Sequence, residues 1–277
     1  MILVTGATGN IGSALLRELR VAGAGPVRGL TRDAARAAFP ADVEAVEGDL
    51  AQPAGLKSAL DGVRSLFLVS GVGADADVLA AARQAGVEHV VLVSSMTVQT
   101  HPHLAPAGAN LAVERLLKES GMAWTILRPT QFASNTLWWA ASIRTQRSVQ
   151  VPYADIGLPA IHPADIAAVA GAALTEPGHR GRTYALTGPA RVTPRQQVEA
   201  ISTALGQEVS LDEISREEAH RQMASFMADD IADAILDLTG GDVNDELLRV
   251  RDTVSQVTGA PARTFQQWAK ENAAAFR

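Results

Sequence analysis

A glycine-rich stretch at the start of the chain constrains the fold more than any other feature. The range Met1–Gly12 reads MILVTGATGNIG. Its apolar, β-branched beginning, Met1–Thr5, is typical of a buried strand. The leucines within Leu15–Leu19 lie on one face of a helix. The segment between strand and helix therefore makes a tight turn, and it carries three glycines: Gly6, Gly9 and Gly12.

Glycine suits this turn for physical reasons. Gly6 permits a sharp exit from the strand, Gly9 lets the backbone approach a phosphate, and Gly12 lets the helix pack closely on the strand. Free N–H groups and the positive end of the helix dipole then face an anion. We therefore predict a dinucleotide site. The spacing of the glycines is G-x-x-G-x-x-G and not G-x-G-x-x-G, so a structural turn without a ligand is the alternative. The residues predicted to hold the pyrophosphate are Gly6, Thr8, Gly9, Asn10, Ile11 and Gly12.

Strands and helices alternate along the first half of the chain, which predicts an α/β fold. The expected strands are 1–5, 26–31, 43–47, 65–70, 89–94 and 124–127. The helical patterns between them are 33–38, 54–60, 75–85 and 109–119. Such alternation implies a Rossmann-type, doubly wound parallel sheet with right-handed crossovers.

The second half is less regular and predicts a smaller lobe. Strands are expected at 149–151 and 183–187, and helices at 131–147, 166–174, 194–205, 216–238 and 265–275. Capping boxes begin at Thr193, Ser215 and Thr264, and the helix 216–238 is expected to break at Ala228–Asp229. We predict a dinucleotide-binding domain at 1–148, to which segments near 160–175 return, and a mostly helical substrate lobe at 149–277.

The ends of the strands matter next, because ligands of such folds bind beyond the carboxyl ends. Strand 26–31 is followed by Arg32, with Arg28 nearby. A guanidinium matches a 2′-phosphate bidentately, so we predict NADPH as the cofactor. A solvated Arg32 is the alternative. Asp33 directly after it leaves NADH open, since a carboxylate at this place holds the ribose 2′-hydroxyl of NAD.

Small and polar residues follow the next two strands. Asp49 and Leu50 suit the amino group and the ring face of an adenine, with a helix cap as the alternative role for Asp49. Ser70, Gly71 and Val72 leave room for the ribose and the nicotinamide. We therefore predict that these five residues contact the cofactor.

The strand 89–94 ends in hydroxyl-bearing residues. The segment Ser94–Thr97 lies where the reactive ring of the cofactor is expected, with a simple strand-end turn as the alternative. We predict Ser94 as a cofactor contact, Ser95 as a catalytic helper and Met96 as a substrate contact.

Aromatic residues are rare in this chain but gather in one place. Phe132, Trp138 and Trp139 lie within eight residues, and Phe132 and Trp139 share one face if 131–147 is helical. They predict a flat apolar wall for a planar substrate, with ordinary core packing as the alternative. His162 is a candidate proton donor or a structural histidine.

Composition excludes several classes of function. The net charge is -6 without a basic cluster, so no nucleic-acid partner is expected. The chain has no cysteine, which excludes disulfides, thiol nucleophiles and thiolate metal sites, and we predict no metal site. No segment resembles a signal peptide or a membrane span, so we expect a cytoplasmic protein that has no membrane contact.

The chain resembles the NmrA-like group of atypical short-chain dehydrogenase/reductases, near its NAD(P)H:quinone oxidoreductase branch. The resemblance covers residues 1–190, and its most specific piece is TILRPTQFASN at 125–135. Other matching pieces are VTGATGNIG, LTRD, GDL, LVSS, AVERLLKESG, HPADIA and YALTGP. The resemblance implies that Pro129–Phe132 lines the nicotinamide and substrate side, with Pro129 and Phe132 toward the cofactor and Thr130 and Gln131 as catalytic helpers.

One departure from the family matters for the chemistry. Typical members use Tyr-x-x-x-Lys as proton donor and ribose ligand on the helix after the fifth strand. In the register set by AVERLL, Pro106 stands at the tyrosine position and Asn110 at the lysine position. Asn110 can still hydrogen-bond a ribose but supplies no charge. The only tyrosines, Tyr153 and Tyr184, lie elsewhere.

This absence suggests the reaction. Ketone reduction gives an alkoxide whose conjugate acid has a pKa of roughly 16, near that of water, and needs a positioned acid. Quinone reduction gives a phenolate-like anion whose conjugate acid has a pKa near 10, as for tyrosine. We therefore predict an NAD(P)H-dependent reductase of a quinone or polycyclic aromatic substrate. The resemblance suggests a role beside a flavin-dependent hydroxylase of aromatic polyketides. The alternative is a non-catalytic NADP(H)-sensing regulator. The sequence leaves the substrate and the oligomeric state open.

Overall fold

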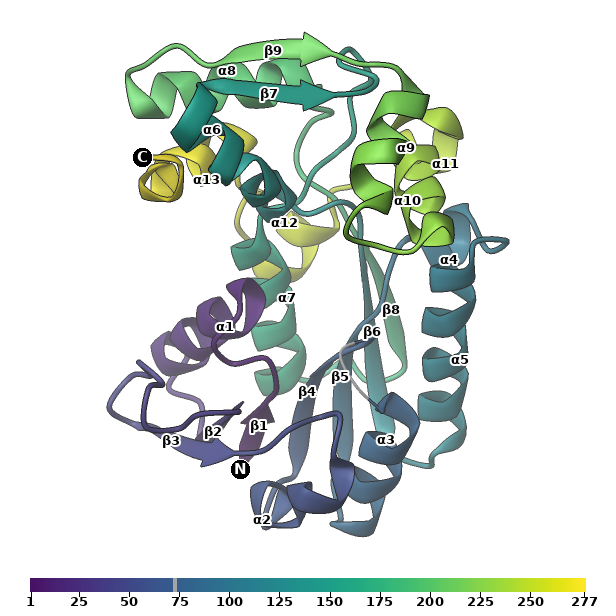
Figure 1. Cartoon of the computed structure of the whole chain (residues 1–277). Helices are drawn as coiled ribbons and strands as arrows, with labels where there is room; N and C mark the ends of the chain where they lie inside the picture. Colours follow the sequence, from purple (N-terminus) through teal and green to yellow (C-terminus); the bar gives the residue numbers. More distant parts are fainter. Residues whose placement is uncertain (72–73) are drawn as a thin grey trace.

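A parallel sheet with helices on both faces forms the larger part of the molecule (Figure 1). The computed structural model describes residues 1–71 and 74–277. Seven strands follow the order β3-β2-β1-β4-β5-β6-β8, and every pairing between them is parallel. They are β1 (Ile2–Val4), β2 (Val27–Thr31), β3 (Val43–Glu47), β4 (Ser65–Val69), β5 (His89–Val93), β6 (Ala123–Pro129) and β8 (Arg182–Leu186). The predicted doubly wound fold is confirmed.

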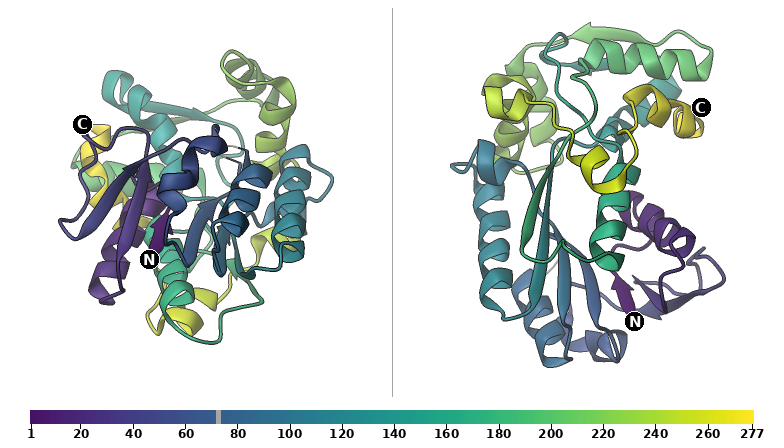
Figure 2. Two further views of the ribbon diagram at one scale, coloured as in Figure 1. Left: turned by 90° about the horizontal axis from the view of Figure 1, so that it is seen from below. Right: turned by 180° about the vertical axis from the view of Figure 1, so that it is seen from behind.

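Helices cover the two faces of the sheet, as the turned views show (Figure 2). One face is covered by α1 (Asn10–Val21), α7 (Pro163–Thr175) and α12 (Thr253–Thr258). The other face is covered by η1 (Pro53–Leu56), α2 (Lys57–Leu60), α3 (Asp75–Gln84) and α5 (Ala105–Glu119).

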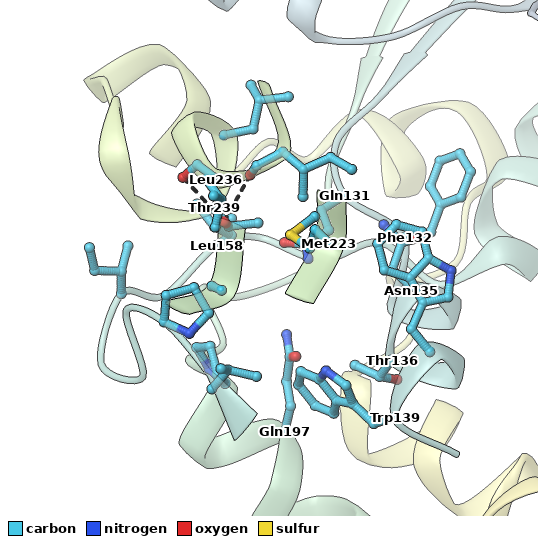
Figure 3. A pocket seen from close by; sticks show the side chains of 18 of the residues that line it. Gln131, Phe132, Asn135, Thr136, Trp139, Leu158, Gln197, Met223, Leu236 and Thr239 are labelled. Carbon is cyan, nitrogen blue, oxygen red and sulfur yellow. Dashed lines mark hydrogen bonds between the residues drawn. The ribbon is translucent and has the colours of Figure 1, made fainter. Parts of the chain in front are cut away.

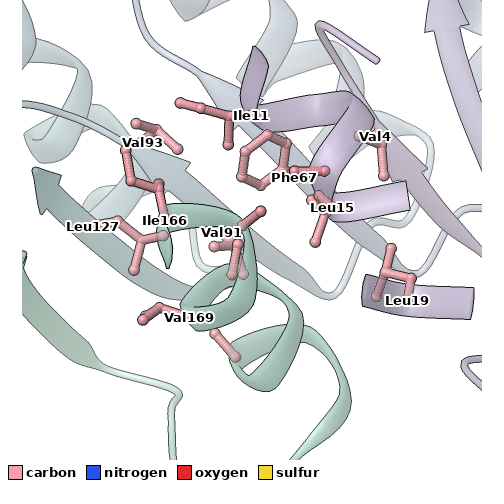
Figure 4. Close-up of a cluster of buried hydrophobic side chains, with 14 of the residues drawn as sticks. Val4, Ile11, Leu15, Leu19, Phe67, Val91, Val93, Leu127, Ile166 and Val169 are labelled. Carbon is pink, nitrogen blue, oxygen red and sulfur yellow. The ribbon is translucent and has the colours of Figure 1, made fainter. Parts of the chain in front are cut away.

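The core consists of two apolar layers, one on each side of the sheet. Successive strand residues point to opposite faces, so Phe67 joins the layer under α1 while its neighbours Leu66 and Leu68 join the other. The layer between the sheet, α1 and α7 gathers Leu15 and Ile166 around Phe67 (Figure 4). These side chains are withdrawn from water, which is the main term that stabilises the fold.

A second layer of the molecule, distinct from the sheet and the two apolar layers that flank it, lies beyond the carboxyl ends of the strands. It holds a parallel pair of strands, β7 (Ser148–Val151) and β9 (Ser210–Glu213). Its helices are η2 (Ala133–Trp139), α6 (Ala140–Gln146), α8 (Pro194–Leu205), α9 (Arg216–Ala224), α10 (Asp229–Leu236), η3 (Asp237–Gly241), α11 (Asp245–Leu248), α13 (Phe265–Glu271) and η4 (Ala273–Phe276). A short helix, α4 (Thr97–Thr100), follows β5. Across the described residues, no helix is both long enough and apolar enough to cross a membrane.

The chain passes between the sheet and the second layer more often than the sequence pattern suggests. Beyond residue 148, α7 returns to the sheet, as expected for 160–175. In addition, β8 pairs with β6 in the sheet, and Val254 of α12 packs in the core under α7. The second layer therefore has a core of its own, built around Trp268, Phe265 and Phe276, but it is not a separate stretch of sequence.

Two predicted helices differ from the structure. Residues 33–38 form bends and a turn instead of a helix. None of them is buried, so no packing stabilises so short a helix, although the Asp33 carboxylate accepts a hydrogen bond from the Arg36 N–H (3.2 Å). The helix predicted at 131–147 begins later, and its first part is a 3₁₀-helix. Ile161 pairs with the backbone on both sides of Phe132, which holds Phe132 extended. Phe132 and Trp139 therefore do not share a helical face.

The capping predictions are largely confirmed. Thr193 and Thr264 form complete capping boxes, and Ser215 accepts from the N–H of Glu218. The predicted helix 216–238 breaks between α9 and α10. Arg216 at the start of α9 joins these pieces, because its guanidinium forms ion pairs with Asp233 (2.9 Å) and Asp237 (2.8 Å).

A buried ion pair joins three elements next to the site described below. The Arg128 guanidinium on β6 donates to both oxygens of Glu114 on α5, at 2.9 and 2.6 Å. The Ser94 hydroxyl after β5 also donates to Glu114 (2.7 Å). Burial raises the pKa of the Glu114 carboxyl, but these hydrogen bonds outweigh it, so its pKa lies below the ordinary value.

This ion pair generates a stability prediction. Glu114→Gln leaves the half-buried Arg128 without its counter-charge, which costs about 3 kcal/mol of unfolding free energy. The melting temperature should fall by roughly 6–12 °C in a chain of this size. Glu119→Gln, an exposed change on the same helix, is the control and should leave it unchanged.

The same pair predicts a pH dependence. The folded state depresses the pKa of Glu114, so its contribution is present above the ordinary value of 4.5 and is lost as the pH falls through the lower, folded value. The difference in melting temperature between wild type and Glu114→Gln should shrink in acid. Melting temperatures that coincide at neutral pH would contradict the assignment.

Candidate active site

The glycine turn has the geometry that the sequence predicts. Gly6 adopts a left-handed backbone (φ +57°), and its carbonyl accepts a hydrogen bond from the Gly9 N–H (2.9 Å). A Cβ on Gly12 would stand 2.1 Å from the Gly6 oxygen, so only glycine lets α1 lie this close to β1.

The N-terminus of α1 is open at the end of β1. Gly9 occupies the cap position without a capping side chain, and the first turn carries no acidic residue. Thr8 and Asn10 are exposed beside it, whereas the Ile11 side chain is buried in the core. Ile11 can therefore offer a ligand its backbone N–H only. These uncapped N–H groups, at the positive end of the helix, fit the pyrophosphate of a dinucleotide.

The residues after β2 favour a phosphate over a hydroxyl. Arg32 is exposed, and no ion pair ties up its guanidinium within the described residues. The Asp33 carboxylate, by contrast, accepts from the Arg36 N–H and pairs with the Arg36 guanidinium (3.5 Å). Arg28 is not a ligand candidate, because it is buried and donates to the backbone oxygens of Ala59 and Asp61.

The next two strand ends lie beside the same edge of the sheet. Asp49 is half-buried, and one of its oxygens accepts from the Ala51 N–H (2.9 Å) in a local turn. It is not a helix cap, because η1 begins at Pro53 with Gln52 at its cap position. Leu50 is buried in the core. Asp75 at the start of α3 accepts from the Ser70 hydroxyl (3.1 Å) and the Gly71 N–H (2.7 Å). Val72 lies outside the described residues.

A cavity of about 700 Å³ opens beyond the carboxyl ends of β5 and β6 (Figure 3). Its floor is formed by Ser94–Thr97 and Pro129–Phe132, and its other walls come from the second layer. The predicted substrate residues Met96, Trp138 and Trp139 all line it. Trp138 is 64% exposed, whereas Trp139 is half-buried against the core of the second layer. Phe132 reaches the same cavity from the face of the sheet.

Ser95 is placed to donate a hydrogen bond into this cavity. Its oxygen accepts from the Thr97 hydroxyl (2.8 Å) and from the Thr97 N–H (3.2 Å). The serine proton is therefore left for another acceptor. The hydroxyl of its neighbour Ser94 is already directed to Glu114.

Two other predicted helpers differ in what they can offer. The Thr130 hydroxyl donates to the carbonyl of Pro159 (2.7 Å), so Thr130 holds the cavity wall rather than a reacting atom. Gln131 is half-buried and lines the cavity, and its backbone oxygen accepts from the Ile161 N–H (2.8 Å).

His162 is a helix cap rather than a proton donor. It is buried, does not line the cavity, and its Nδ1 accepts from the Ala164 N–H at the start of α7. The other ring nitrogen meets the Glu271 carboxylate (3.2 Å). Burial lowers the pKa of His162. These contacts favour a structural role for His162 over that of a proton donor.

Neither tyrosine replaces the missing acid. Tyr153 lies in the second layer beside Arg216, and the Tyr184 hydroxyl meets the ring of His179 (2.8 Å). Neither side chain lines the cavity. Pro106 lies in the first turn of α5, and Asn110 lies on the same helix, half-buried and outside the cavity lining.

The upper wall of the cavity contains none of the residues predicted from the sequence. This wall includes Gln197 of α8, Met223 and Phe226 near the end of α9, and Leu236 of α10. One signal was available, because Gln197 stands among Val198 and Ile201 on the apolar face of α8.

Comparison with known proteins identifies the first part of the chain. Residues 6–177 match a protein-family model described as NAD(P)H-binding. The chain belongs to this NAD(P)H-binding family. The resemblance to NmrA-like atypical short-chain dehydrogenase/reductases is confirmed with it.

Several relatives of this NAD(P)H-binding protein are reductases. A (4-alkanoyl-5-oxo-2,5-dihydrofuran-3-yl)methyl phosphate reductase of Streptomyces griseus is 38% identical over all of this chain and 99% of its own. An NAD(P)H azoreductase of Xenophilus azovorans is 38% identical over the same shares. The crystal structure of an NADPH-dependent quinone oxidoreductase of Escherichia coli in complex with NADPH is 28% identical, with a TM-score of 0.81 over 98% of this chain and 99% of that one. The protein is an NAD(P)H-dependent oxidoreductase.

The choice between NADPH and NADH can be tested at Arg32. Arg32→Ala removes a guanidinium able to bind a phosphate, which we expect to weaken NADPH binding roughly 10- to 100-fold, while NADH changes less than about twofold. Fluorescence titration of both cofactors measures this. Arg64→Ala, exposed after α2 and paired with Glu88, is the control. An equal loss for both cofactors would contradict the assignment.

Proposed function

We propose that this protein reduces uncharged quinones or other planar aromatic acceptors, with NADPH as the preferred donor. The cavity beyond β5 and β6 carries the proposal. Its walls are mostly apolar, with the aromatic side chains of Phe132, Trp138 and Trp139 among them. A planar ring system can bury its faces there, which is the principal source of affinity in such pockets.

The electrostatics of the cavity narrow the class of acceptor. Among the described residues that line it, none is Asp, Glu, Lys, Arg or His. A charged substrate would lose its hydration without gaining a counter-charge, which costs several kcal/mol. The substrate proposed for this protein is therefore uncharged, unlike the phosphate ester that the name of the Streptomyces relative describes.

The residues near the reacting ring support a quinone. When bound, the reduced nicotinamide supplies a hydride. Ser95 can then donate a hydrogen bond to the acceptor oxygen, because its proton is not used by Thr97. A serine hydroxyl stabilises a phenolate-like product, whose conjugate acid has a pKa near 10, by a hydrogen bond alone, and water can supply the proton afterwards. An alkoxide, whose conjugate acid has a pKa near that of water, would need a positioned acid. Most of the rate would come from holding donor and acceptor face to face.

A turnover assay tests the proposal. Purified protein, NADPH and a panel of naphthoquinones are mixed, and the nicotinamide absorbance is followed above the uncatalysed background. We expect turnover of neutral 1,4-naphthoquinone, with a kcat/KM at least about tenfold above that of its 2-sulfonate. Absence of turnover with every quinone would overturn the proposal, and equal turnover of the sulfonate would overturn the argument from charge. Coupling to a flavin-dependent hydroxylase stays a prediction from the resemblance alone.

Ser95 gives a second test of the mechanism. Ser95→Ala removes the hydrogen-bond donor, and we expect kcat for 1,4-naphthoquinone to fall by roughly tenfold or more, with the dissociation constant of NADPH unchanged. Ser120→Ala is the matched control, since its hydroxyl donates to the Leu117 carbonyl at the end of α5. A kcat equal to that of the wild type would show that Ser95 does not act on the acceptor.

A further inference from the structure

Gln197 is a buried polar side chain without an evident structural task. It is 4% exposed and lies in the first half of α8. Its neighbours on this helix face, Val198 and Ile201, belong to the apolar core of the second layer. A polar amide on an otherwise apolar helix face is best placed where a hydrogen-bond partner can reach it.

The side chain of Gln197 points into the cavity. Figure 3 shows it directed upward from α8, next to the indole of Trp139 and opposite Met223. Within residues 1–71 and 74–277, no hydrogen bond joins its side-chain amide to another residue, and the amide atoms are not among the fully buried atoms without a partner, so they reach the cavity. Its two ends, a donor and an acceptor, therefore face the space that a substrate would fill.

Several other polar groups that line the cavity are already paired. The Thr136 hydroxyl donates to the Ala133 carbonyl (2.8 Å), and the Thr239 hydroxyl donates to the Ile235 carbonyl (2.8 Å). Gln222 donates to the side-chain oxygen of Gln150 (3.0 Å). Among the described residues of the lining that are polar and buried, Gln197 thus differs from Ser94, Thr130 and Thr136 in offering both a free donor and a free acceptor.

The helix that carries Gln197 is held firmly. The hydroxyl of Thr193 accepts from the Gln196 N–H, and the Gln196 side chain accepts from the Thr193 N–H, so the first turn is closed by a complete capping box. Pro194 at the helix start restricts the backbone further. A side chain on such a rigid turn is preorganised for binding.

We propose that Gln197 is a specificity-determining residue that hydrogen-bonds an oxygen on the edge of the acceptor farthest from the reduced carbonyl. The inference rests on the proposed function and names its substrate more closely: an uncharged, multi-ring quinone with a distal hydroxyl or carbonyl oxygen. The Gln197 amide donates to a carbonyl or accepts from a hydroxyl, and Trp139 packs against the ring between the two ends.

The test compares two acceptors that differ by one oxygen. Gln197→Met keeps the length of the side chain and removes its hydrogen bonds. We expect KM for 6-hydroxy-1,4-naphthoquinone to rise about five- to tenfold, with kcat unchanged, because one hydrogen bond is lost. KM for 1,4-naphthoquinone should change less than about twofold. Gln207→Met, an exposed position after α8, is the matched control.

Two further measurements distinguish a binding role of Gln197 from a packing role. Binding of naphthalene-2,6-diol to the NADP⁺-bound protein, followed by tryptophan fluorescence, should weaken five- to tenfold in Gln197→Met. The melting temperature should stay unchanged, because the amide makes no hydrogen bond to another residue within the described part of the chain. A parallel rise in KM for both quinones with a lower melting temperature would show a packing role and overturn the inference. Wild-type protein that reduces neither quinone would instead overturn the proposed function, while diol binding would still test Gln197.

Discussion

The first helix can rest against the first strand only because no side chain separates Gly12 from the carbonyl oxygen of Gly6. This approach lets Leu15 and Leu19 enter the same buried layer as Phe67 and Ile166. It also leaves the N-terminus of α1 uncapped at the edge where the strands end. One steric constraint therefore contributes to the core and shapes the anion site, and a methyl group at Gly12 would disturb both.

A second constraint ties the cavity to the sheet. The chain leaves the sheet after β6 and returns at α7, and the two passing segments hydrogen-bond to each other. The Ile161 N–H donates to the Gln131 carbonyl and the Ala133 N–H donates to the Ile161 carbonyl, both at 2.8 Å. The floor of the cavity is thus fixed by backbone contacts, while its upper wall comes from other parts of the chain.

Local sequence patterns could predict the sheet and the cofactor turn, because both depend on short-range rules. Strand 43–47 was predicted to the residue, and the reasons for Gly6 and Gly12 hold in the structure. Two of the differences come from contacts between distant segments. Pairing with Ile161 keeps Phe132 out of a helix, and Glu271 meets the ring of His162 from 109 residues away. No periodicity within either segment could reveal these partners.

The ion pairs of Arg216 have a consequence for how such enzymes diversify. Asp233 and Asp237 lie in the same stretch as Arg216, so residues 216–241 are held together by ion pairs within the stretch itself. This stretch supplies Met223, Phe226 and Leu236 to the cavity, and it contributes nothing to the glycine turn. Substitutions within this stretch would therefore change the shape of the cavity between relatives, while the glycine turn that faces the nucleotide stayed the same.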